Sequence, residues 1–166
     1  MTRRWVLGAV AVACVLAGQP TAHAAPRNTV TVDVGISQVK IGDSLKQVRA
    51  KVGSRGKAGP VETMANGRPF TVYRFPKRLH VQIVSGFGVN AMWTDGPRQR
   101  TRSGIRVGST QGELVDAVDV SCQALLPDGS RELCQTEELP TEGETSTAFY
   151  VEDDTITRIE IATLLD

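Results

Sequence analysis

Two short stretches of the chain place apolar residues at the spacing of a helix face. These are Leu45, Val48 and Val52 in the first stretch, and Leu114, Val115 and Val118 in the second. Residues three and four positions apart share one side of a helix, so each stretch predicts a short helix with one buried face. Helices of this length are not stable alone in water, and both must therefore pack against other elements.

Alternation of apolar and polar residues predicts strands after each helix. The expected strands are residues 61–64, 70–75, 79–84 and 89–94 after the first helix, and residues 121–126, 131–136, 148–151 and 155–161 after the second. The Asn66-Gly67 pair is typical of a tight hairpin turn. Residues 54–60 are expected to form a solvated loop, and residues 29–34 either a short strand or a linker.

The two halves of the chain repeat one pattern at a constant offset of 66 residues. The matched positions are Val39 with Ile105, Ile41 with Val107, Gly42 with Gly108, Ser44 with Thr110, Gln47 with Glu113, Val48 with Leu114 and Val52 with Val118. A hydroxyl residue followed three positions later by Gln or Glu predicts a capping box at the start of each helix. The repetition predicts an α+β fold of two tandem helix-plus-antiparallel-sheet units, with the helices on one face of the sheet.

The strand pattern also predicts which residues face away from the helices. The last strand alternates isoleucine with charged residues, so Ile159 and Ile161 should face the helices. At an offset of 67, Met92 matches Ile159, which turns Trp93 outward. The outward residues expected to bind a partner are Arg74, His80, Gln82, Trp93, Arg158 and Glu160. A slip of one residue in the register would instead place Trp93 at the edge of the core, between the halves.

Residues 1–25 have the pattern of an export signal. Arg3 and Arg4 precede an apolar run that is short for a bilayer span, and Ala22-His23-Ala24 is a small-x-small cleavage site. Sec and twin-arginine export both fit, and a permanent membrane anchor is the alternative. Removal of the leader leaves 166 − 25 = 141 residues with no stable membrane insertion: a linker or short strand at 26–35, a basic unit at 36–97 and an acidic unit at 98–166.

Two cysteines, Cys122 and Cys134, remain after the leader is removed with Cys14. An even number of cysteines in an exported chain predicts a disulfide, which would stabilise the fold by about 3 kcal/mol. A metal site built from two cysteines without a nearby histidine is the weaker alternative. The acidic triplet at residues 152–154 lacks the spaced oxygen ligands of a calcium loop. No metal or cofactor is expected.

Charge is divided unevenly along the chain. Residues 26–108 hold 15 Lys or Arg and 4 Asp or Glu, a balance of 15 − 4 = +11, whereas residues 109–166 hold 2 and 14, a balance of 2 − 14 = −12. The halves either attract each other within a dipolar molecule, or the basic half meets an anionic wall polymer, lipid headgroup or acidic protein. Nucleic acid is not an expected partner, because the chain lacks the motifs that bind it.

The chain offers little for catalysis. His80 is the one histidine after the leader, and its strand places no serine, cysteine or metal ligand beside it. This leaves little room for a Ser–His or Cys–His mechanism. Phosphate loops, zinc-binding helices and dinucleotide motifs are missing from the sequence. We therefore expect a non-enzymatic protein, with a small secreted hydrolase as the weakest alternative.

The repeated element resembles a known helix-plus-sheet unit, found in the β-lactamase inhibitory protein and in small outer-membrane assembly lipoproteins. The residues that carry the resemblance are Val39, Ile41, Gly42, Ser44, Val48, Gly53, Tyr73, Phe75, Leu79, Val81, Gly88 and Val89. The duplication and the 12-residue separation of the cysteines are most similar to the inhibitor. The first half departs from the inhibitor in having no cysteine, and the chain lacks a convincing lipobox.

The resemblance implies two helix-and-sheet units and a concave sheet used for protein contact. We expect a monomeric binding module, secreted or associated with the cell envelope, that contacts a protein partner through its open sheet face. An inhibitor-like mode of contact is one form of this, without β-lactamase carried over as the target. The alternative is an envelope-surface binder that uses the basic half.

Overall fold

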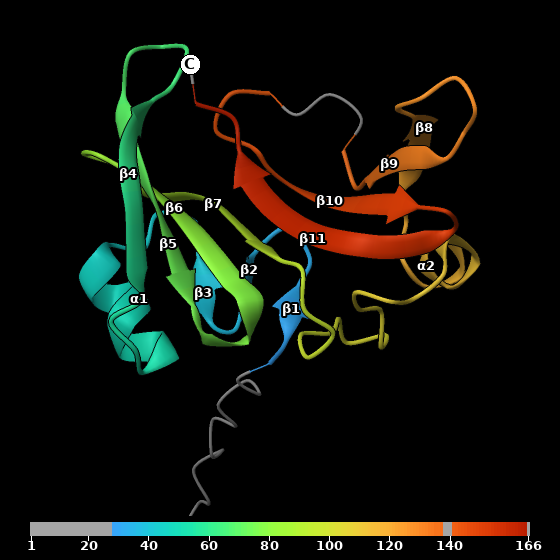
Figure 1. Ribbon diagram of the computed structural model, residues 1–166, viewed down its shortest axis with the longest axis horizontal. Coiled ribbons are helices and arrows are strands. Elements are labelled where there is room, and N and C mark those ends of the chain that lie inside the picture. Colours follow the sequence, from blue (N-terminus) through green and yellow to red (C-terminus); the bar gives the residue numbers. More distant parts are fainter. Residues whose placement is uncertain (1–27, 138–140, 166) are drawn as a thin grey trace, which may run out of the picture.

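The structure is a computed structural model that describes residues 28–137 and 141–165. The predicted leader lies outside the described residues. An antiparallel eight-stranded sheet has the order β4-β5-β6-β7-β11-β10-β9-β8 (Figure 1). Its strands are β4 (Lys57–Thr63), β5 (Pro69–Phe75), β6 (Leu79–Val84), β7 (Gly88–Thr94), β8 (Ser121–Ala124), β9 (Arg131–Gln135), β10 (Thr145–Glu152) and β11 (Thr155–Thr163). The α+β class is confirmed.

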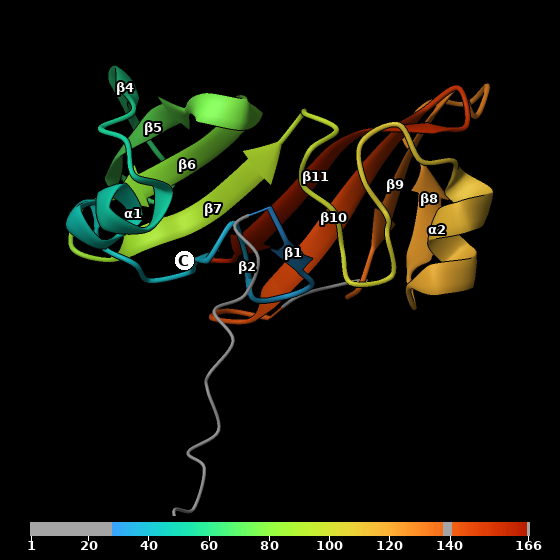
Figure 2. The ribbon, with the colours of Figure 1, turned by 90° about the horizontal axis from the view of Figure 1, so that it is seen from below.

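Two helices and a small sheet accompany the large sheet. The helices are α1 (Leu45–Val52) and α2 (Gln111–Ala117), and a short 3-10 turn, η1 (Pro76–Arg78), precedes β6. The small sheet contains β1 (Val30–Thr31), β2 (Gly35–Ile36) and β3 (Val39–Lys40). Figure 2 shows α1 and α2 toward opposite ends of the molecule, with β1 and β2 between them.

The core lies between these elements and one face of the large sheet. Val48 of α1 and Leu114 of α2 are fully buried in the same cluster as Ile36 of the small sheet. The large sheet contributes Met92, Ile159, Ile161, Phe149 and Val81, none of which is exposed. Burying each such side chain contributes about 1.5–3 kcal/mol. The predicted inward positions of Met92, Ile159 and Ile161 are confirmed.

Both predicted capping boxes are present. The Ser44 hydroxyl accepts a hydrogen bond from the Gln47 N–H, and the Gln47 side chain accepts one from the Ser44 N–H. Thr110 and Glu113 make the same two contacts at the start of α2. Each box satisfies two backbone N–H groups that a helix start leaves free.

Each helix start is also attached to a long strand by matching backbone hydrogen bonds. The Gly42 N–H donates to the Val89 carbonyl over 2.7 Å, and the Val89 N–H donates to the Asp43 carbonyl over 2.9 Å. In the second half, Gly108 donates to the Ile156 carbonyl over 2.8 Å, and Ile156 donates to the Ser109 carbonyl over 2.9 Å. Gly42 and Gly108 both have a positive φ, at 82° and 94°, which the absence of a side chain permits.

The sheet is continuous because β7 pairs with β11. Their register places Trp93 opposite Glu160 and Met92 opposite Ile161. The segments predicted at 36–97 and 98–166 therefore meet in one sheet rather than in two separate sheets.

Two sequence predictions differ from the structure, and one open choice is resolved by it. Residues 57–60, expected in a loop, begin β4, which is exposed along its whole length and carries a bulge between Ala58 and Val61. Proline and glycine are tolerated there because β4 is an edge strand with an irregular register. Val115, expected on the buried face of α2, is 50% exposed, because Leu114 is the buried side chain of this short helix. Residues 29–34, expected to be either a short strand or a linker, contain the short strand β1 followed by a turn.

The caps give a stability test. Ser44→Ala and Thr110→Ala should each lower the free energy of unfolding by about 1 kcal/mol, because each leaves helix N–H groups without an acceptor. Urea unfolding followed by circular dichroism measures this. Ser85→Ala serves as a control at an exposed turn position, and a loss at Ser85 as large as at the caps would contradict the role of the capping boxes.

Candidate functional site

The strand register brings the predicted contact residues onto one face of the large sheet, opposite the core. Arg74 of β5 lies opposite His80 of β6, and His80 lies opposite Trp93 of β7. Trp93 in turn lies opposite Glu160 of β11. Because side chains alternate along a strand, Arg158 shares the face of Glu160, and Gln82 shares that of His80. We call this surface the open face.

Four side chains of the open face stack in sequence across four strands. The His80 and Trp93 rings are 5.1 Å apart at an interplanar angle of 4°. The Arg158 guanidinium lies 5.6 Å from the centre of the Trp93 ring and 5.4 Å from that of Tyr150. Stacked rings and cation–π contacts each contribute about 0.5–1.5 kcal/mol when partly exposed. We call this row, His80–Trp93–Arg158–Tyr150, the aromatic–cation ladder.

Glu160 lies beside the ladder and is largely buried by it. Arg158 Nη1 lies 3.8 Å from Glu160 Oε2, and the side chains of Arg158 and Glu160 are 45% and 22% exposed. Burial raises the pKa of Glu160, which the Arg158 charge and a hydrogen bond from the Tyr150 hydroxyl oppose. Burial also raises the pKa of Tyr150, and the Glu160 charge adds to it. The ladder thus holds its carboxylate in a partly desolvated setting.

The surroundings of His80 lower its pKa and so disfavour the charged ring. Burial lowers the pKa of His80, and the charges of Arg74 and Arg158 lower it further, while Asp95 opposes them. His80 Nε2 lies 3.8 Å from Asp95 Oδ1, an atom that is buried without a hydrogen-bond partner among the described residues. This distance is too long for a hydrogen bond, so the Asp95 contact is electrostatic. His80 thus stacks on Trp93 and makes no hydrogen bond to Asp95.

Trp93 is half-buried on the open face, flanked by His80 and Arg158, rather than buried between the two halves. Arg74 is exposed at one end of the row beside His80. Gln82 lies two residues after His80 on the same face of β6, opposite Ala91 and outside the ladder. The structure thus brings together His80, Trp93, Arg158 and Glu160, with Arg74 and Gln82 on their margin.

Sequence reasoning missed Tyr150. This residue lies between Phe149 and Val151, which are both buried. The alternation along β10 turns Tyr150 to the open face, where it lies opposite Arg158. The same in–out argument used for β11 would have found this outward tyrosine, but its contact with Arg158 also requires the pairing of β10 with β11.

Small residues form the floor of the open face beside the ladder. Ala91, Ala162 and Ser146 lie opposite one another on β7, β11 and β10, and Ala148 lies opposite Glu160. Ala91 is 6% exposed and Ala148 is 9% exposed, although the helices and the small sheet pack on the opposite face. These small residues thus lie beside the ladder on the open face and are themselves nearly buried.

The predicted disulfide is present. Cys122 of β8 and Cys134 of β9 lie directly opposite each other, with an S–S distance of 2.04 Å. Glu132 is near both sulfurs, and the three residues are the metal-ligand grouping found among the described residues. Because the sulfurs are bonded to each other, they are not thiolate ligands. The bond fastens the hairpin at the sheet edge that β8 forms.

Comparisons by sequence find neither a matching protein-family model nor a matching curated protein. Two solved structures are similar. The uncharacterized protein YfeY from Escherichia coli aligns with a TM-score of 0.50 and 14% identity over 80% of this chain and 97% of its own. An extracellular protein containing an SCP domain from Bacillus anthracis aligns with a TM-score of 0.45 and 12% identity over 74% of this chain and 44% of its own. The likeness to YfeY is one of fold.

The setting of His80 predicts its titration. In the chain without its leader, the His80 ring signals should report a pKa below 6.5, because burial and two arginines disfavour the charged ring. Asp95→Asn should lower this pKa further, and Arg74→Gln should raise it. Proton NMR across pH measures all three.

The lowered pKa of His80 also makes the stability of the fold depend on pH. A depressed histidine pKa means that the unfolded chain binds the proton more readily. The contribution of His80 should be present above pH 6.5 and be lost as pH falls from 6.5 through the lower folded pKa. A pKa at or above 6.5, or no response to Arg74→Gln, would contradict this description of the site.

Proposed function

We propose that the chain is an exported, non-enzymatic binding module that contacts a protein partner through the open face. The observation that carries this proposal is the aromatic–cation ladder on a sheet face opposite the core. Tryptophan, tyrosine and arginine are the residues that most often dominate the energy of protein interfaces. Here they are already held by one another, so binding would order few new side chains.

The charge of the open face indicates the character of this partner. Arg74 and Arg158 are exposed, and Lys57 of β4 lies opposite Arg74 at the edge of the sheet. Glu160 is the acidic residue beside the ladder, and burial raises its pKa. A protein surface with carboxylates facing these basic groups would be electrostatically complementary.

We further propose that the fold is a duplicated helix-and-sheet unit, and that an inhibitor-like mode of contact is one form of its function. The matching capping boxes and the matching backbone bonds from Gly42 and Gly108 support the duplication. The order of the large sheet also places the strands of each half in mirrored positions about the β7–β11 pair. A monomer suffices for this arrangement.

Export to the cell exterior or envelope is part of the proposal. The disulfide between Cys122 and Cys134 supports it, because such bonds persist in oxidising compartments. Among the described residues, no helix is long and apolar enough to span a bilayer.

Alanine substitutions separate binding from folding. Trp93→Ala and Arg158→Ala should each weaken capture of the partner by at least about 2 kcal/mol, roughly thirtyfold, because each removes a contact at the centre of the ladder. Met92→Ala, one residue from Trp93 but buried in the core, should instead destabilise the fold by about 2–5 kcal/mol.

The measurement is affinity capture from exported and envelope fractions, with the captured protein identified and its affinity then determined. Val115→Ala is the matched control, since it removes an exposed apolar side chain from α2. Unchanged capture by Trp93→Ala and Arg158→Ala, with the fold intact, would refute the proposed surface.

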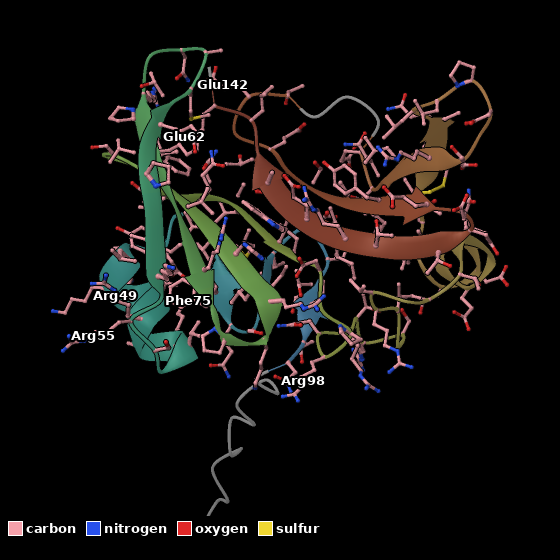
Figure 3. The ribbon with its side chains drawn as sticks, viewed as in Figure 1. Arg49, Arg55, Glu62, Phe75, Arg98 and Glu142 are labelled. Atoms are coloured by element: carbon pink, nitrogen blue, oxygen red, sulfur yellow. A yellow bond between two sulfur atoms is a disulfide. The ribbon has the colours of Figure 1, made fainter. Side chains whose placement is uncertain are left out.

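A second candidate is an envelope-surface binder that uses the basic half. Arg49, Arg55 and Arg98 extend from the lower part of the molecule in Figure 3, while Glu62 and Glu142 lie toward its upper end. Along the chain, charge is segregated into a basic half and an acidic half. This segregation favours contact with an anionic polymer or lipid surface.

The dependence of binding on salt concentration distinguishes the protein-binding module from the envelope-surface binder. Adsorption to an anionic envelope fraction should fall steeply between about 0.1 M and about 1 M salt, where the Debye length shortens from about 10 Å to about 3 Å. Binding through the ladder, which includes stacking and apolar contact, should depend less on salt. Co-sedimentation at both salt concentrations measures this, and salt-independent adsorption would exclude the envelope-surface candidate.

A further inference from the structure

An open groove lies between the small sheet, a turn in the connection to the second half, and the end of α2. Its volume is about 1030 Å³, and its lining is mostly apolar. The apolar walls come from the partly exposed Val32 on one side and from Ala117 and Val118 on the other, and Val30 lines the groove with only 1% of its surface exposed. Pockets for small ligands commonly measure about 300–1,000 Å³, so the groove is large enough for such a ligand.

The basic side of this groove is built on a firmly bonded turn. The Val30 N–H donates to the Arg100 carbonyl over 2.8 Å, and the Arg100 N–H donates to the Asn28 carbonyl over 3.1 Å. The Thr101 N–H donates to the Ile105 carbonyl over 2.8 Å, and the Ile105 N–H returns to Thr101 Oγ1 over 3.0 Å. In Figure 2 this yellow connection lies between β1 and α2. The turn is therefore preorganised.

Three arginines lie close together at this turn. Arg100 and Arg102 line the groove and are exposed, and Arg106 lies directly opposite Arg100 in an antiparallel bridge. Like charges placed directly opposite each other across a strand pair are destabilising. The four ion pairs formed among the described residues involve none of the three. An anion at this turn would relieve the repulsion and accept hydrogen bonds from the guanidinium groups.

The rest of the lining limits how much negative charge the groove can take. Asp119, an exposed residue after α2, also lines it, so two arginines and one aspartate leave a balance of 2 − 1 = +1. A ligand with one negative charge matches this balance better than a polyanion, which would also meet the aspartate.

We propose that the groove binds an acyl lipid with a single negatively charged head, its chain against the valines and its head at Arg100 and Arg102. Apolar walls alone would accept any hydrophobic chain, and an arginine turn alone would accept any small anion. Their adjacency in one groove selects a molecule that has both parts. This inference is independent of the open face, because none of the groove residues belongs to the ladder.

The test is isothermal titration calorimetry of the purified protein with dodecanoate below its micelle concentration. Acetate and inorganic phosphate supply the head without the chain, and dodecyl maltoside supplies the chain without the charge. Dodecanoate should bind at one site, and each of the other probes should bind at least about tenfold more weakly, since each lacks one of the two contacts.

Substitutions locate the site. Arg100→Gln combined with Arg102→Gln should weaken dodecanoate binding about tenfold or more, because the side chains are exposed and the turn is held by backbone bonds. Asp119→Asn should strengthen binding. Arg98→Gln, an exposed arginine outside the groove, is the matched control and should leave binding unchanged.

Three outcomes would overturn the proposal. Equal binding of dodecanoate and dodecyl maltoside would show a merely apolar groove. Equal binding of dodecanoate and inorganic phosphate would show a site for small anions. Binding that responds to Arg98→Gln as strongly as to the paired substitution would show adsorption to the general basic charge, as expected for an anionic polymer. Thermal unfolding of each variant without ligand establishes that the fold is retained.

Discussion

The antiparallel pairing of β7 with β11 is the interaction on which the rest of the architecture depends. It joins the strands that follow α1 to those that follow α2, and it fixes which residues of the two halves become neighbours. Because Trp93 lies opposite Glu160, the side chain of Arg158 reaches the indole ring, and Tyr150 completes the row from the next strand. A shift of one residue would exchange this row for the buried face of Met92 and Ile161.

The regular part of the sheet coincides with the ladder. The pairing register shifts on β6 after Gln82 and on β10 after Tyr150. Neither shift lies within the ladder, so the side chains from His80 to Tyr150 stay on the same face of the sheet. Within this stretch the rings and guanidinium exclude water from Glu160, which raises its pKa, while the exposed part of Arg158 keeps a charge at the surface. The stacked aromatic rings and the accessible arginine are the basis on which we propose this face as a protein contact.

Much of the fold could be predicted from local physics, whereas the sites depend on distant contacts. A capping box spans only four residues, so the pairs Ser44–Gln47 and Thr110–Glu113 predict the two helix starts from local sequence alone. In the same way, the alternating isoleucines of β11 predict which of its faces is buried. β4 was missed in part because Gly59 and Pro60 obscure the pattern of an edge strand. The groove beside the Arg100 turn was not visible in the sequence, since β1, this turn and α2 are brought together only by tertiary structure.

The central claim is that the open face, and not the helix-covered face, meets the partner. Its most direct test is site-specific photocrosslinking, with a photoreactive residue placed at Gln82 on the open face or at Val115 on α2, each in an otherwise unchanged chain. We predict one discrete crosslinked protein from position 82 in exported and envelope fractions, and none from position 115. A partner captured from position 115 but not from position 82 would contradict the account.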